Sequence, residues 1–215
     1  MKKLEVLLLT KDSEWGSLAH EILDSYNCII ECYKGRHGEK MPQLQKRAYD
    51  FVVSFSSPWI VPQELLENAK IAAINFHPGP PNYPGIGCTN FAIYNGEKEF
   101  GATCHHMNFK VDTGQIIEVV RFPLYETDNV IRLTGRTYTN MFMMYRKILE
   151  GFFKDGTFPK STEKWARKPY TRKELNDLCK VTEDMDRDEI ARRIRATKFP
   201  GKPGAHYFLL NKFGN

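Results

Sequence analysis

Short apolar runs alternate with amphipathic segments along the first half of the chain, and this alternation constrains the fold more than any other feature. Residues 4–9 are almost all apolar, as expected of a strand buried on both faces of a parallel sheet. From Ser13, a residue suited to a helix N-cap, the apolar spacing becomes helical, as at Leu18 and Ile22. Further elements are predicted at 28–33, 51–54 and 72–74 (strands) and at 62–69 (helix). This order predicts an α/β fold with a doubly wound, mostly parallel sheet.

The second half of the chain contains further strands, a long helix and an appendage. The pattern predicts these elements at 89–94 (helix), 102–109 and 115–122 (strands), and from about 128 to 155 (helix). We divide the chain into a main domain, residues 1–156, and a C-terminal appendage, residues 157–215, with one helix at 186–195. The appendage has too few apolar residues to bury a core alone. We therefore expect it to pack on the main domain or on a second subunit, as in a homodimer.

The net charge of the chain is concentrated in this appendage. The formal net charge is +5, and residues 160–202 hold 13 Lys or Arg against 8 Asp or Glu, which accounts for the whole excess. Such a segment either faces phosphate groups, on a nucleotide, a nucleic acid or a membrane, or forms a solvated surface of mixed charge. Arg192, Arg193 and Arg195 are candidates for a diphosphate, with a solvated helical face as the alternative.

Composition narrows the class of protein. Hydrophobic residues make up 41% and charged residues 27%, which is typical of a globular chain and not of a disordered one. No apolar run approaches the roughly 20 residues that span a bilayer. The run at 4–9 is too short for a signal peptide, so we expect a cytoplasmic protein without a membrane partner. The five cysteines show no CxxC spacing, which favours buried thiols and provides no zinc site.

Polar residues with catalytic potential follow the strand at 72–74. Asn75 and His77 are two residues apart, so in extended chain they point the same way. The proline-rich segment 78–81 then holds the chain rigid. Asp112 lies in the turn between two later strands and could approach His77. An amide can stabilise an oxyanion, a histidine can exchange protons near neutral pH, and a carboxylate can orient it. The alternative is that Asn75 caps a turn and His77 is structural. Neither GxGxxG nor GxxxxGK[ST] occurs.

Three ordered motifs resemble the formyltransferase family. They are INFHPGPPNYPG at 74–85, GATCH at 101–105 and VDTGQII at 111–117. The resemblance implies a Rossmann-like formyltransferase fold and a catalytic trio of Asn75, His77 and Asp112. It implies N10-formyltetrahydrofolate as formyl donor and no metal. By the same resemblance, the folate-binding residues would be Ser56, Trp59, Ile60, Val61 and Asp112. Residues 59–61 could instead be simple core residues.

Departures from the family pattern indicate the subgroup. The segment after His77 differs from the HxSLLPxxxG pattern of the purine and tRNA enzymes, and the appendage is too short for the barrel of the tRNA enzyme. Residues 190–208 resemble the sugar-nucleotide N-formyltransferases. The resemblance therefore implies, as acceptor, the primary amine of a nucleotide-linked amino sugar, such as GDP-perosamine or a dTDP-linked 4-amino-4,6-dideoxyhexose, and a role in O-antigen and lipopolysaccharide biosynthesis.

Three residues are expected to contact the acceptor: Lys11, Tyr83 and His105. For His105 a packing role is equally open. Two rival functions are kept. One is the same chemistry on glycinamide ribonucleotide or methionyl-tRNA. The other is a binding module in which the basic segment holds nucleic acid. On the sugar-nucleotide interpretation, nucleic acid is not a partner.

Overall fold

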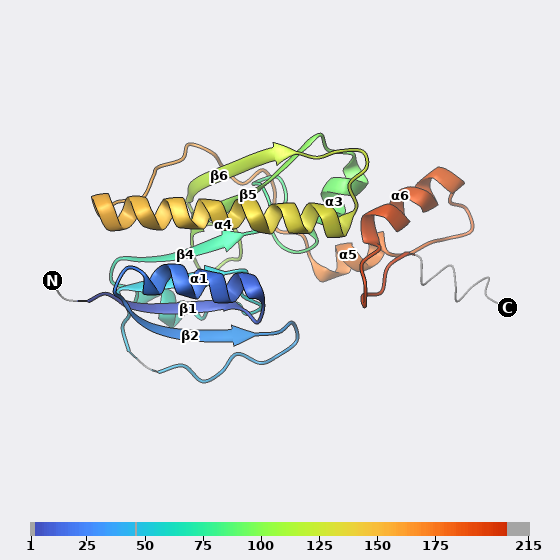
Figure 1. Cartoon of the computed structure of the whole chain (residues 1–215). Helices are drawn as coiled ribbons and strands as arrows, with labels where there is room; N and C mark the ends of the chain where they lie inside the picture. Colours follow the sequence, from blue (N-terminus) through green and yellow to red (C-terminus); the bar gives the residue numbers. More distant parts are fainter. Residues whose placement is uncertain (1–2, 46, 206–215) are drawn as a thin grey trace.

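Six strands form one sheet in the order β2-β1-β3-β4-β5-β6 (Figure 1). The computed structural model describes residues 3–45 and 47–205. Strands β1 to β4 are parallel, whereas β5 runs antiparallel to both of its neighbours. This topology confirms the predicted doubly wound, mostly parallel α/β sheet. The strands span Glu5–Lys11 (β1), Ile29–Gly35 (β2), Phe51–Phe55 (β3), Ala72–His77 (β4), Glu99–His106 (β5) and Ile116–Pro123 (β6).

Helices cover the sheet and continue into the C-terminal segment. They span Glu14–Asp24 (α1), Gln63–Glu67 (α2), Cys88–Asn95 (α3), Val130–Asp155 (α4), Arg172–Leu178 (α5) and Arg187–Thr197 (α6). Helix α4 lies across the sheet beside α1 in Figure 1, and both contribute to the largest buried cluster. Alternation along β1 shows why both faces are apolar: Val6 and Leu8 join this cluster, while Leu7 and Leu9 pack in a second cluster on the other face.

The strand order reverses beside β1, which places a ligand site at its carboxyl end. Strand β1 lies between β2 and β3, with Lys11 opposite Gly35 and Thr10 opposite Phe55. In open α/β sheets, ligands bind beyond the carboxyl ends of the strands at such a reversal. The antiparallel strand β5 then lies against β4 with His105 opposite Asn75. The two motifs that carry polar chemistry are thus neighbours in the sheet.

The C-terminal segment packs on the main part of the chain through α6. Leu178 and Ala196 join a buried cluster with Phe91 of α3 and Leu133 of α4. The side-chain amide of Asn90 donates to the Ala196 carbonyl oxygen at 2.7 Å. Residues 206–208, the end of the stretch that resembles the sugar-nucleotide enzymes, lie outside the described residues. Across the ranges that are described, no helix is long and apolar enough to cross a membrane.

Three of the four arginines of α6 hold this helix in place. Arg193 pairs with Glu189 at 2.6 Å and donates to backbone carbonyls at the end of α5. Arg192 also pairs with Glu189 and lies over the ring of Tyr94, 4.3 Å from its centroid. Arg195 donates to the Asp128 carbonyl oxygen at 3.0 Å. These guanidinium groups therefore bind α6 to the rest of the chain.

Two elements differ from the sequence-based prediction. The strand expected at 102–109 is shifted to Glu99–His106, because Asn108 begins a turn and its Oδ1 accepts from the Lys110 N–H at 2.9 Å. Helix α5 was not predicted. It begins with a capping box, in which the Thr171 hydroxyl and the Glu174 carboxylate each accept from the other's backbone N–H.

Candidate active site

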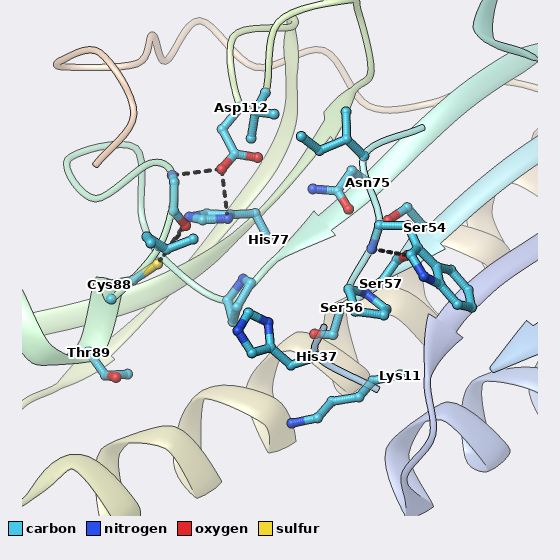
Figure 2. A pocket seen from close by; sticks show the side chains of 18 of the residues that line it. Lys11, His37, Ser54, Ser56, Ser57, Asn75, His77, Cys88, Thr89 and Asp112 are labelled. Atoms are coloured by element: carbon cyan, nitrogen blue, oxygen red, sulfur yellow. Dashed lines mark hydrogen bonds and ion pairs between the residues drawn. The ribbon is translucent and has the colours of Figure 1, made fainter. Parts of the chain in front are cut away.

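Asn75 and His77 lie at the carboxyl end of β4 and face the same side of the strand, as their spacing predicts. Figure 2 shows them pointing toward Asp112, which lies in the β5–β6 loop. The side-chain amide of Asn75 is 3.1 Å from His105 Nε2. His77 and His105 are almost fully buried, with 3% and 2% of their surface exposed. Neighbouring antiparallel strands therefore bring both histidines to one buried point.

The segment after β4 folds back around His77. His77 Nε2 lies 2.8 Å from the Tyr83 carbonyl oxygen and 3.6 Å from Cys88 Sγ. Burial, followed by the charge of Asp112, raises the pKa of the Cys88 thiol, which makes it a poor nucleophile. Gly79 is needed here because a Cβ would lie 2.8 Å from His77 Nε2. The rigid proline-rich loop thus encloses the imidazole.

Asp112 connects the site. Its Oδ2 is 3.2 Å from His77 Nδ1 and accepts the Gly85 N–H at 2.7 Å, while its Oδ1 is 3.3 Å from His105 Nε2. Its φ of +46° is left-handed, a conformation that Asp and Asn tolerate better than most residues. Burial raises the pKa of this carboxyl, but the charge of His77 and the contacts with His105 and Gly85 outweigh it. The net effect lowers the pKa of Asp112 to about 2.

The hydrogen bonds of the two rings set where protons can reside. Both nitrogens of His77 face acceptors, the Asp112 carboxylate and the Tyr83 carbonyl. A neutral imidazole has one N–H and satisfies one of them; the imidazolium satisfies both. His105 Nδ1 donates to the His106 carbonyl oxygen at 2.8 Å, so its Nε2 either accepts from Asn75 or donates to Asp112. The cluster can therefore hold a proton on either side of one carboxylate.

A cleft of about 1130 Å³ opens onto this cluster. Among the predicted site residues, nine line it: Lys11, Ser56, Trp59, Ile60, Val61, Asn75, His77, His105 and Asp112. Trp59 and Val61 also pack against the core cluster of β1 and β3, so the core interpretation and the cleft position both apply to them. Ile60 is 74% exposed at the cleft.

The structure does not bring the Tyr83 side chain into the cleft. Its hydroxyl donates to Glu97 Oε1 at 2.6 Å and accepts from the Asn95 amide at 2.9 Å. Burial and the contact with Glu97 raise the pKa of Tyr83. What this residue contributes to the site is its backbone carbonyl, next to His77.

Lys11 and Ser56 lie together although different ligands were expected for them. Parallel pairing of β1 with β3 brings their carboxyl ends side by side. His37, from the loop after β2, joins them in Figure 2. The Ser56 hydroxyl is buried and has no hydrogen-bond partner among the residues that the structure describes, and its φ is +52°. A polar atom left unsatisfied in a cleft is suited to a ligand.

Three lining residues of the C-terminal segment were not identified from the sequence. They are Arg172, Asn176 and Lys202. The concentration of positive charge at 160–202 was the available signal, but it did not separate these residues from the arginines of α6. Within residues 3–45 and 47–205, no group of three or more His, Cys, Asp or Glu is placed to hold a metal ion.

Comparison with known proteins assigns the family. The sequence profile described as Formyl transferase matches residues 30–148, more than half of the chain. The chain belongs to the formyl transferase family. Among curated members, the methionyl-tRNA formyltransferase of Lactobacillus johnsonii is 26% identical over 178 residues, which cover 81% of this chain and 55% of the relative. This formyl transferase chain therefore spans about half the length of that curated relative.

Solved structures of other formyl transferases share the fold over most of their length. The 4-N formyltransferase from Francisella tularensis has a TM-score of 0.75 at 18% identity, covering 94% of this chain and 91% of that one. The N-formyltransferase from Helicobacter canadensis, solved with folinic acid and dTDP-3-aminofucose, has a TM-score of 0.69 at 17% identity, covering 90% and 80%. These similarities confirm the Rossmann-like formyltransferase fold.

Proposed function

We propose that this protein transfers a formyl group from N10-formyltetrahydrofolate to the primary amine of a nucleotide-linked amino sugar, without a metal ion. The observation that carries the proposal is that Asn75, His77 and Asp112 line one large cleft, which the cationic side chains of Lys11, Arg172 and Lys202 also line. The fold shared with the N-formyltransferase from Helicobacter canadensis, which was solved with dTDP-3-aminofucose, supports a nucleotide-linked sugar as acceptor.

The chemistry requires stabilisation of an oxyanion and two proton movements. The neutral amine attacks the formyl carbon, so a new N–C bond forms and the carbonyl oxygen becomes negative. Asn75 and a protonated His77 act as donors to that oxygen, and one such donor is typically worth about 3–4 kcal/mol in the transition state. The intermediate then collapses with cleavage of the bond to N10 of the folate.

Two proton transfers accompany the formyl transfer. The amine loses one proton, which Asp112 receives directly or through His105, and N10 gains one from His77 as it leaves. The low pKa of Asp112 keeps this group ionised at neutral pH, so its first role is to hold and orient the two rings.

Two groups of lining residues match two anionic substrates. Ile60, Phe109 and Val111 are exposed apolar side chains that line the cleft and lie in the loop after β3 and the loop that carries Asp112. We assign this group, with Lys11 and His37, to the folate and its carboxylates. The diphosphate of the acceptor is assigned to Arg172 and Lys202, which have no ion-pair partner among the described residues and lie on the C-terminal segment.

Calorimetry tests this assignment. Arg172→Ala and Lys202→Ala are expected to weaken binding of the nucleotide sugar about tenfold or more and leave folate binding within about twofold. Lys11→Ala should do the reverse. Lys173→Ala is the matched control, because Lys173 neighbours Arg172 but does not line the cleft. Folate affinity that falls with Arg172→Ala while nucleotide affinity persists would show that the two assignments are reversed.

A substrate panel tests the activity itself. dTDP-, GDP- and UDP-linked 3-amino and 4-amino sugars would be incubated with the folate donor, and formylated products identified by mass. We expect a 4-amino-4,6-dideoxyhexose to react fastest. The curated relative is a methionyl-tRNA formyltransferase, so methionyl-tRNA and glycinamide ribonucleotide belong in the same panel. Faster formylation of either, or RNA binding that weakens strongly as the salt concentration rises, would refute the sugar acceptor.

A further inference from the structure

Trp165 separates the catalytic histidines from a second hollow on the far side of the cluster. This hollow, of about 640 Å³, lies between the β5–β6 loop and the C-terminal segment and is lined by residues 113–116 and 161–165. Trp165 lines this hollow, whereas the main cleft is lined by other residues. His77, His105 and Asp112 line the main cleft. The indole therefore lies between the second hollow and the two imidazoles that line the cleft.

The indole contacts both imidazoles edge to face. Its ring centroid is 5.0 Å from that of His105 at 87°, and 5.8 Å from that of His77 at 74°. Its Nε1–H donates to the Gly114 carbonyl oxygen at 2.8 Å, two residues after Asp112. A single side chain thus covers the imidazoles of His77 and His105 and is hydrogen-bonded to the loop that carries Asp112.

Backbone pairing fixes Trp165 in this position. The next residue, Ala166, donates its N–H to the Pro81 carbonyl oxygen at 3.1 Å. Tyr170 and the loop residues Pro84 and Ile86 exchange two further backbone hydrogen bonds, at 2.8 and 3.2 Å. The stretch 165–170 is therefore joined to the same loop that encloses His77.

We propose that Trp165 is a positioning residue that keeps water in the second hollow away from the ion pairs of Asp112 with His77 and His105. Water reaching this point would raise the local dielectric constant and compete for the ring N–H groups, so the attraction that holds both rings would weaken. The effect on turnover rests on the proposed formyl transfer; the shielding of the rings does not.

Proton NMR in water tests the shielding without any substrate. The ring N–H protons of His77 and His105, assigned with His77→Gln and His105→Gln, are expected to exchange slowly. Trp165→Ala should speed their exchange about tenfold or more. Trp165→Phe retains an aromatic wall and should keep slow exchange. Trp15→Phe is the matched control, since Trp15 packs on Tyr138 and Phe142, away from the cluster.

Kinetics adds a second readout. Trp165→Ala should lower kcat about tenfold or more with KM within about threefold, and Trp165→Phe should restore most of kcat. If Trp165→Ala fails to fold, Trp165→Leu, which fills part of the space, is expected to show the faster exchange. Unchanged ring N–H exchange in a folded Ala or Leu variant would overturn the proposal. Faster exchange without any formyl transfer in the parent would instead overturn only the proposed function.

Discussion

Replacing Asp112 with asparagine removes one negative charge from between two imidazoles and leaves the backbone undisturbed. Asn tolerates the left-handed φ of +46° as well as Asp does, so the exchange adds no conformational strain. The Gly85 N–H keeps an acceptor, because the amide oxygen can replace Oδ2. What is lost is the charge attraction to His77 and His105, and the amide NH₂ in the place of Oδ1 cannot accept from His105.

The size of this attraction follows from the pKa. The pKa of Asp112 falls from its ordinary 3.8 to about 2 in the folded protein. At about 1.4 kcal/mol per pKa unit, the charged carboxylate contributes about 2.5 kcal/mol to the free energy of unfolding. A lowered folded-state pKa gives a contribution that is complete above about pH 4 and disappears as the pH falls toward 2.

Urea unfolding as a function of pH measures this contribution. At pH 7 we expect Asp112→Asn to be about 2.5 kcal/mol less stable than the parent, and the difference to shrink as the pH falls below 4. Turnover at pH 7 should fall about 100-fold or more. Asp50→Asn is the control, because it replaces a buried carboxylate at the amino end of β3, away from the site. This variant is expected to lose stability and keep its turnover. A stability difference that does not change with pH, or normal turnover in Asp112→Asn, would refute the reasoning.

Three further outcomes are expected. Asn75→Ala and His77→Ala should each lower turnover about 100-fold or more while the protein stays folded by circular dichroism, and near-normal rates would remove them from the catalytic group. Gly85→Ala should lower the free energy of unfolding by more than about 2 kcal/mol, because its φ is +88° and a Cβ would lie 2.4 Å from the Tyr170 carbonyl oxygen; Gly151→Ala in α4, with open space around it, should instead raise it by about 0.5–1 kcal/mol. Chelator and reductant should leave activity unchanged, and activity that is lost on chelation and restored by zinc would reveal a missed metal site.

The sequence could predict those parts of the site that depend on local structure. Asn75 and His77 follow a buried strand at a spacing of two, so their common direction needed only the strand to be recognised. The approach of His105 to Asn75 depends on the register of β5 against β4, and that register is set by contacts across the whole sheet. Periodicity carries no information on such pairing, which is why the role of His105 stayed open.

Residues on the C-terminal segment show the same limit more strongly. The sequence places Arg172 and Arg193 in one basic region, with nothing local to distinguish them. In the fold, Arg193 is held by Glu189 and backbone carbonyls, whereas Arg172 lines the cleft. The start of α5 was encoded locally, in the Thr171 and Glu174 capping box, but its seven residues are too few for an apolar period to be detected.

The backbone pairing of Gly85 with Tyr170 also has a consequence for the order of events during synthesis. Domains generally begin to fold from the N-terminal end as the chain leaves the ribosome. The strands β1 to β6 and helix α4 are all complete by residue 155, yet three backbone hydrogen bonds of the loop around His77 form only when residues 166–170 emerge. A nascent chain can therefore complete its sheet while the loop around His77 still lacks these bonds, and activity is expected to arise only after residues 166–170 have been made.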